Sequence, residues 1–169
     1  AFGGEVRASP NGREIGVGRM IRLNRAGVAH PMYRGKSVCF SALTVHMDEV
    51  SVPPKGAVIL AGNEHSHIQA FVMENDGLKF WGVQYHPEYT LAELAAIFRR
   101  YGQRLIDAGL FADQGALETM ATNWMTLHQD PDRRDLAWQY GIDNDALRYE
   151  RRLLELGNWL KYSVGKIRS

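Results

Sequence analysis

Phe80–Glu88 reads FWGVQYHPE, an apolar and aromatic run that stops at a histidine, a proline and a glutamate. The run predicts a strand, and Pro87 ends it because proline has no N–H for a ladder and fixes its own φ. Side chains two residues apart in an extended chain point to the same side, so His86 and Glu88 can emerge together. This strand end is therefore the first candidate site of the chain.

An imidazole beside a carboxylate is half of a nucleophilic site. The carboxylate orients the ring and stabilises its charged form, while the other ring nitrogen takes a proton from Ser or Cys. The alternative is a strand-end histidine with a solvated glutamate beside it, and for a bare H-x-E that alternative is favoured. Spacing alone leaves the choice open.

Size and composition are those of one ordinary globular domain. The chain has 169 residues, of which 45% are hydrophobic and 23% charged, and its formal net charge is +1. The length allows a substantial core, and the charge gives no reason to expect nucleic acid or a membrane as partner. No apolar run approaches a membrane span, and no signal-peptide pattern is visible. One cysteine excludes an internal disulfide, so a cytoplasmic protein is expected.

The first half of the sequence predicts short strands joined by tight turns. Asp76-Gly77 between two apolar runs indicates a hairpin, and Asn24–Gly27 is typical of a turn. The expected strands are Glu5–Ala8, Arg13–Gly18, Arg19–Leu23, Val28–Tyr33, Ser37–Leu43, Ala57–Ala61, His67–Met73 and Leu78–Tyr85.

After the His-Pro-Glu segment the hydrophobic period changes from 2 to 3.6, which indicates helices. Thr90 and Glu93 form a capping box at the start of the first helix, and Gly109 offers its end. Further helices are expected to start at Asp113, at Pro131, and at Asp143 or Asn144, with Gly141 ending the middle one. We expect Trp124, Trp138 and Trp159 to serve helix packing rather than ligand binding.

Three blocks, in this order, resemble the class I glutamine amidotransferase family. Ala1–Val6 with Glu14–Gly16 looks like the family's segment just downstream of its nucleophile. Val45–Val50 with Pro53–Gly56 looks like its middle block, H-x-D-x-V followed by a Pro-Gly turn. Gly82–Glu88 looks like its catalytic His/Glu motif, and the three blocks together cover about the first half of the chain.

The resemblance implies an α/β fold, a flavodoxin-like three-layer sandwich, and a Cys-His-Glu triad that releases ammonia from glutamine. The family's thiolate attacks the side-chain amide to form a glutamyl thioester, which water hydrolyses. His86 matches the general base and acid, and Glu88 matches the orienting carboxylate. The backbone at Met47 and Asp48 falls where family members hold the glutamine main chain.

The family's nucleophile elbow, Gly-x-Cys-x-Gly-x-Gln, does not occur in these 169 residues. By the family pattern it would end just before Ala1. We therefore expect the C-terminal part of a longer protein, or a separate upstream chain, and a fold short of several central parallel strands. Cys39 lacks the glycines of an elbow, lies on an expected strand and is predicted to be a buried structural residue. Alone, the chain is expected to be inactive as a glutaminase.

For domain organisation the resemblance implies a partial amidotransferase domain at 1–108 and a helical extension packed on it at 109–169. The extension could cap the sheet, form a homodimer interface or dock a partner. Glutamine is the expected substrate, and an ammonia-accepting synthetase, as a separate protein or a further domain, is the expected partner. No cofactor and no metal are expected; a metal site of His46, Asp48, His65 and His67 is the weaker alternative.

Two other functions stay open at this level. A non-catalytic interaction or regulatory domain would keep the fold without the nucleophile, and the absent elbow motivates it. A hydrolase of other γ-glutamyl bonds would keep the triad and change the substrate.

Overall fold

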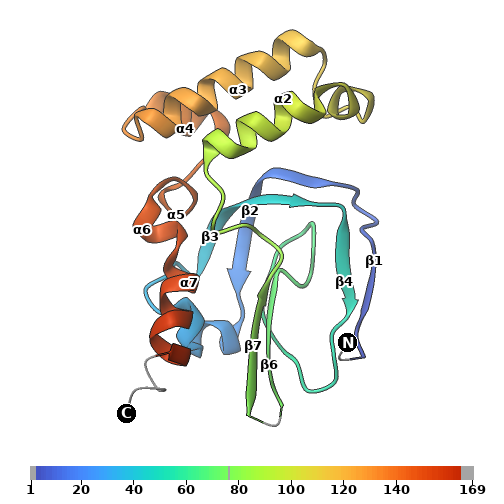
Figure 1. Cartoon of the computed structure of the whole chain (residues 1–169), viewed down its shortest axis with the longest axis vertical. Coiled ribbons are helices and arrows are strands. Elements are labelled where there is room, and N and C mark those ends of the chain that lie inside the picture. The colour runs from blue at the N-terminus through green and yellow to red at the C-terminus, as the bar shows by residue number, and fades with distance from the viewer. Residues whose placement is uncertain (1–2, 76, 165–169) are drawn as a thin grey trace. The chain divides into compact units, whose positions relative to one another are not determined.

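The computed structural model describes residues 3–75 and 77–164, which form strands and helices in two compact units (Figure 1). The first unit comprises residues 1–87 and 144–169, and the second comprises residues 88–143. These boundaries differ from the predicted 1–108 and 109–169, because α2 (Leu91–Asp107) packs with α3 (Gln114–Gln129) in the second unit. The predicted domain division stays a prediction.

The first unit is built on antiparallel strands. A five-stranded sheet has the order β3-β2-β5-β6-β7, and β1 and β4 form a two-stranded sheet. Only Met47 separates β3 from β4, so one bent stretch of chain belongs to both sheets. The strands are β1 Glu5–Ala8, β2 Glu14–Leu23, β3 Cys39–His46, β4 Asp48–Val52, β5 Val58–Gly62, β6 Ala70–Asn75 and β7 Leu78–Val83.

The strand β2 is irregular in a way that opens the sheet. Its register with β3 shifts between Gly18 and Ile21, and Met20 within this bulge has a φ of 54°. On its other edge β2 pairs with β5 only through Arg22 and Leu23. The two strands therefore diverge toward the start of β2.

The predicted hairpin of β6 and β7 is confirmed, with pairing from Ala70 opposite Val83 to Asn75 opposite Leu78. Asp76 of its turn lies outside the described residues, while Gly77 has a φ of +80°. The apolar face of the sheet packs on a core cluster that includes Tyr85. Its members are Ile21, Leu23, Met32, Tyr33, Phe40, Ala42, Leu60, Ala61, Ala70 and Tyr85.

The prediction of a turn and strand over residues 24–33 is wrong. The helix α1 (Arg25–Ala29) and a 3-10 turn, η1 (Pro31–Tyr33), occupy this stretch. The Asn24 carboxamide accepts the Gly27 N–H at 2.9 Å and donates to the Ile59 carbonyl at 2.6 Å. Asn24 thus caps a helix that is anchored on β5, a contact that propensity cannot foresee.

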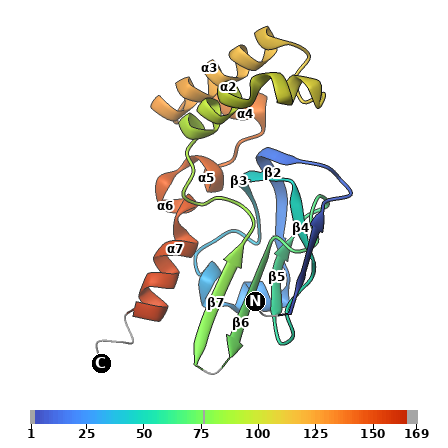
Figure 2. The ribbon, with the colours of Figure 1, turned by 45° about the vertical axis from the view of Figure 1, so that its right-hand side comes forward.

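The last helices return to the first unit. They are α5 (Asn144–Leu147), α6 (Tyr149–Arg152), α7 (Leu154–Trp159) and a π-helical turn, η2 (Leu160–Val164). They form a column of short helices beside the sheet (Figure 2), with α5 packed on β3 and α7 on η1.

The second unit is helical, and its sequence signals are mostly confirmed. Thr90 and Glu93 make both bonds of the capping box before α2, and Asp113 caps α3. The helix α4 (Arg134–Tyr140) begins three residues after Pro131 and ends, as predicted, at Gly141 in the left-handed conformation.

The three tryptophans expected in helix packing differ in how far they are buried. Trp124 is buried against Phe98, as predicted. Trp138 is 86% exposed, so its predicted packing role is wrong; α4 spans only seven residues, and Leu136 is its buried side chain. Trp159 is partly exposed.

Gly27 lets α1 approach β5, because a Cβ there would overlap the carbonyl oxygen of Leu60. Gly27→Ala is therefore expected to lower the free energy of unfolding by about 1–3 kcal/mol. Gly157 on α7 is the matched control: a Cβ there meets nothing within 4 Å, so Gly157→Ala should stabilise by up to about 1 kcal/mol. Urea unfolding of both variants checks this, and equal effects at the two positions would contradict it.

Candidate active site

The chain leaves β7 at Val83 and is held in place as far as Pro87. The Gln84 N–H donates to the Gln69 carbonyl at 2.9 Å, and the His86 N–H donates to the Leu43 carbonyl at 2.7 Å. Tyr85 and Pro87 are buried and His86 is half-buried. The site histidine therefore lies at a well-anchored strand end, as its sequence predicted.

Glu88 is exposed and begins the second unit. His86 belongs to the first unit, so the predicted pairing of the imidazole with the Glu88 carboxylate stays a prediction. The sequence favours this pairing because only Pro87 separates His86 from Glu88.

Met47 and Asp48 lie at the bend between β3 and β4, with both side chains exposed. The Met47 carbonyl accepts the Ser9 N–H at 2.9 Å. The Asp48 carbonyl accepts a bond from the His46 ring at 3.1 Å and one from the Gln84 amide at 3.5 Å. Hydrogen bonds thus hold the backbone of this bend, whereas its assignment to glutamine binding stays a prediction.

Gln84 joins the two predicted parts of the site. Its amide nitrogen donates to the Asp48 carbonyl, and its amide oxygen accepts the Val50 N–H at 3.3 Å. Gln84 precedes His86 by two residues, so this side chain ties the histidine strand to the Met47–Asp48 bend. Sequence reasoning missed the role; its only signal was a polar residue on the same side of the strand as His86.

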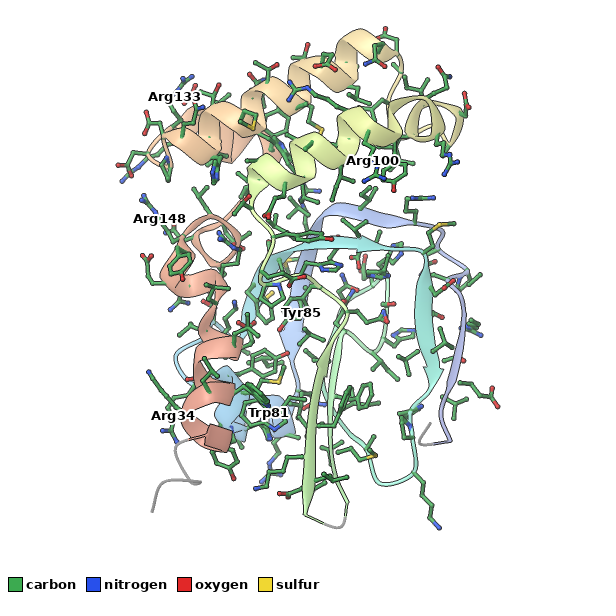
Figure 3. All side chains as sticks on the ribbon, in the orientation of Figure 1. Arg34, Trp81, Tyr85, Arg100, Arg133 and Arg148 are labelled. Carbon is green, nitrogen blue, oxygen red and sulfur yellow. The ribbon has the colours of Figure 1, made fainter. Side chains whose placement is uncertain are left out.

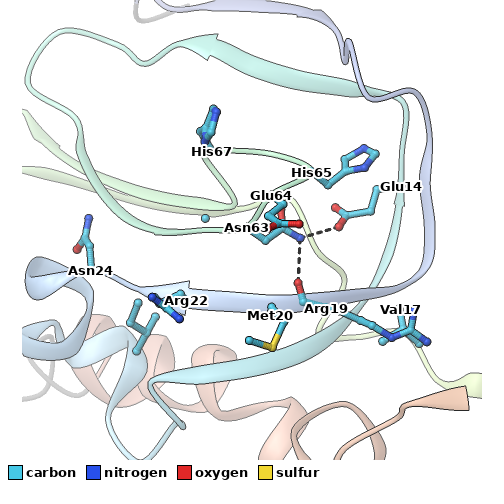
Figure 4. A pocket seen from close by; sticks show the side chains of 12 residues that line it. Glu14, Val17, Arg19, Met20, Arg22, Asn24, Asn63, Glu64, His65 and His67 are labelled. Carbon is cyan, nitrogen blue, oxygen red and sulfur yellow. Dashed lines mark hydrogen bonds between the residues drawn. The ribbon is translucent and has the colours of Figure 1, made fainter.

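A second missed feature is a buried carboxylate, Glu14, at the start of β2 (Figure 4). Its oxygens accept bonds from Asn63, from Gln69 and from His46, each at 2.7 Å. Burial by itself raises the pKa of Glu14, but these three bonds outweigh it and the pKa lies below its ordinary value.

His46 is positioned directly opposite Glu14 in the β2–β3 register. One ring nitrogen contacts the Glu14 carboxylate and the other contacts the Asp48 carbonyl. The ring thus bridges a side chain of β2 and the backbone of β4. The pair connects the buried end of β2 to the Met47–Asp48 bend.

The divergence of β2 and β5 leaves a cavity of about 780 Å³ beside Glu14. Its walls are β2 and the loop from Gly62 to His67 (Figure 4). Asn63 closes one side by donating to Glu14 and, at 3.3 Å, to the Arg19 carbonyl on the open edge of β2.

Two of the three histidines of the alternative metal site, His46 and His65, contact each other and other groups of the protein. The rings of His46 and His65 meet edge to face with centroids 5.8 Å apart, and the His65 Nε2 lies 3.2 Å from the Gly12 carbonyl. Within residues 3–75 and 77–164, no group of three His, Cys, Asp or Glu side chains is arranged to hold a metal ion.

Cys39 is exposed, so the prediction that it is buried is wrong. It is the first residue of β3, where its sulfur contacts that of Met20 at 3.8 Å. Leu43, whose carbonyl holds His86, lies four positions further along the strand, about 13 Å away. The prediction rested on how often a free cysteine on a strand is buried, but Cys39 is the first residue of an edge strand of the sheet.

The fold is of the α/β class, with a curled sheet. Residues 1–101 match the family model for glutamine amidotransferase class I, and the chain belongs to this family. The predicted family and α/β fold class are thereby confirmed.

Two curated relatives illustrate the likeness in sequence. A gamma-glutamyl-L-1-hydroxyisopropylamide hydrolase of a Pseudomonas species is 31% identical over 97% of this chain and 56% of its own. A glutamine-hydrolyzing GMP synthase component of Sulfurisphaera tokodaii is 44% identical over 36% of this chain and 31% of its own.

Glutamine amidotransferase structures from Thermotoga maritima and Methylobacillus flagellatus both superpose with a TM-score of 0.56. They are 20% and 22% identical, and cover 93% and 95% of this chain and 56% of each of theirs. The chain thus spans about half the length of the relatives it matches. No helix in the part of the chain that the structure describes is long and apolar enough to cross a membrane.

Glu14→Gln should lower the free energy of unfolding at pH 7 by about 1–3 kcal/mol, because the amide cannot accept from three donors as the carboxylate does. The folded pKa of Glu14 is depressed, so its contribution is complete above its ordinary value of about 4.3 and is lost as the pH falls through the folded value. The difference between variant and wild type should therefore shrink in acid.

Urea unfolding between pH 3 and pH 7 measures this difference. Glu64→Gln is the control, an exposed glutamate on the wall of the same cavity. A difference in free energy of unfolding between Glu14→Gln and wild type that stays the same from pH 3 to pH 7 would contradict the assignment.

Proposed function

We propose that this chain supplies the general base of a glutamine amidotransferase that releases ammonia from glutamine. The observation that carries the proposal is the membership of residues 1–101 in the class I family, together with a strand end that presents His86. Gln84 links this strand end to the Met47–Asp48 bend, and the link supports a common role for both.

In the proposed reaction a cysteine thiolate attacks the side-chain amide carbon of glutamine. His86, which has taken the thiol proton, gives it to the departing ammonia and leaves a glutamyl thioester. His86 then takes a proton from water, whose oxygen attacks the thioester, and returns that proton to the thiolate. Glutamine and water become glutamate and ammonia, Glu88 orients the imidazole, and the Met47–Asp48 backbone holds the substrate's main chain.

The nucleophile in this proposal comes from outside the 169 residues. Two features support that: the sequence contains no Gly-x-Cys-x-Gly-x-Gln string, and the relatives are nearly twice as long as the matched region. Cys39 is a poor substitute because it lies at the far end of β3.

A second substrate class is favoured by one specific likeness. The Pseudomonas relative, matched along almost the entire chain, is named for hydrolysis of a γ-glutamyl amide of an amino alcohol. The same triad would cleave such an amide with the amine as leaving group in place of ammonia. The GMP synthase relatives, which are named as glutamine-hydrolyzing, favour instead a synthetase partner that accepts ammonia.

The first test is the gene sequence immediately upstream of the codon for Ala1. We expect a Gly-x-Cys-x-Gly-x-Gln string within about ten residues. A reading frame that starts at Ala1 would contradict the proposal and favour a non-catalytic interaction domain.

The second test is catalysis by the protein that includes this upstream segment. It should release ammonia from glutamine, and His86→Ala should lower kcat by about 10³-fold or more, because no other group would then shuttle the proton. His128→Ala is the matched control, since His128 is an exposed histidine on α3. Full activity of His86→Ala would refute the role of His86.

The same assay with γ-glutamyl alkylamides in place of glutamine separates the two substrate classes. A higher kcat/KM for glutamine supports the amidotransferase, whereas a higher kcat/KM for the alkylamide supports the second class.

A further inference from the structure

A buried chain of polar groups leads from the strand before His86 to the C-terminal helices. The Tyr85 hydroxyl donates to the Glu155 carboxylate on α7 at 2.8 Å, and it lies 2.9 Å from the hydroxyl of Tyr33. Lys36 completes the chain with an ion pair to Glu155 at 3.1 Å. Tyr85, labelled in Figure 3, immediately precedes His86.

These groups are almost entirely removed from water. The side chains of Lys36 and Glu155 are 1% and 3% exposed, and Tyr85 is 2% exposed. Burial, with the neighbouring Tyr33 and the Glu155 charge, raises the pKa of Tyr85, so its hydroxyl stays a donor. The Lys36 ammonium also donates to the Arg151 carbonyl at 3.0 Å and lies over the Phe40 ring.

Burying an ion pair costs desolvation that the mutual attraction often fails to offset. An apolar pair of similar volume would fill the same space between β3, η1 and α7. Lys36 and Tyr85 instead both donate to the Glu155 carboxylate, and Lys36 also donates to the Arg151 carbonyl. Such a network fixes one arrangement of its members more strictly than apolar packing does.

The residue that follows His86 is held from the same helices. Arg152, the last residue of α6, is buried and donates from its Nε to the Pro87 carbonyl at 3.1 Å. Tyr85 and Pro87, the two neighbours of His86, are therefore each tied to the α6–α7 segment. The His86 N–H, bonded to Leu43, is the third anchor.

We propose that α6 and α7 position the imidazole of His86, with Glu155 and Arg152 as positioning residues that act through Tyr85 and Pro87. The proposal rests on the catalytic role proposed for His86. It gives the C-terminal helices a role in the active site, because a shift of this strand end would move the general base away from its substrate. A displacement of about 1 Å in a reacting group can cost about 100-fold in rate.

The direct test observes His86 itself in the 169-residue chain, without any need for catalysis. The carbon–proton correlation of the His86 ring is assigned among the six histidines by its loss in His86→Ala. Glu155→Gln and Arg152→Lys should each shift this correlation. The control Glu150→Gln, an exposed glutamate on α6, should leave it in place.

Glu155→Gln leaves the buried Lys36 charge without its partner and is expected to destabilise the fold. Tyr85→Phe keeps that ion pair and therefore serves as a less destabilising second variant. It removes the hydroxyl bonded to Glu155 and keeps the ring in the core. A His86 correlation that is unchanged in folded Tyr85→Phe and in folded Arg152→Lys would overturn the proposal.

In the protein that includes the upstream segment, Glu155→Gln or Tyr85→Phe should lower kcat about 10-fold or more with KM changed less than about 2-fold, because only the base is displaced. A purely structural role would lower the amount of folded enzyme and leave kcat per folded molecule unchanged, which would contradict the proposal. If His86→Ala retains activity while the His86 correlation still shifts in Tyr85→Phe, the proposed function fails and the positioning by α6 and α7 stands.

Discussion

The buried bond between the Tyr85 hydroxyl and the Glu155 carboxylate joins two parts of the chain that are 70 residues apart. It links the strand end that bears His86 to the helices that close the first unit. Lys36 balances the Glu155 charge, so the loop before β3 is drawn into the same contact. The core of this unit, with Phe40 and Tyr85 in edge-to-face contact, packs around that bond.

A second buried carboxylate, Glu14, lies at the start of β2, at the end of the sheet where β7 also ends. Glu14 is hydrogen-bonded to His46 on β3, to Asn63 just after β5 and to Gln69 just before β6. Because β2 and β5 pair over only two residues, these bonds replace the missing ladder between the diverging strands. Gln69 also connects this cluster to the candidate site, because its backbone carbonyl accepts the N–H of Gln84.

Local signals predicted the elements whose ends depend on their own residues. The capping box at Thr90, the cap at Asp113 and the stop at Gly141 are formed by neighbours in the sequence, so each could be predicted without the fold. The strand predicted over residues 28–33 is wrong because the helix found there depends on Asn24 binding the backbone of β5. The predictions for Cys39 and Trp138 are wrong because apolar type indicates burial only where another element covers the residue.

The sequence by itself determined the family, through three ordered motifs, and the position of His86 at a strand end, through the proline that follows it. It also determined that no elbow cysteine lies within these residues. Only the tertiary structure decided that Gln84 joins the His86 strand end to the Met47–Asp48 bend, that Glu14 is buried among three hydrogen-bond partners, and that Glu155 and Arg152 hold the neighbours of His86. The physical reason is that these contacts join residues up to 70 positions apart, and a polar side chain gives no local sign of the partner that folding will bring to it.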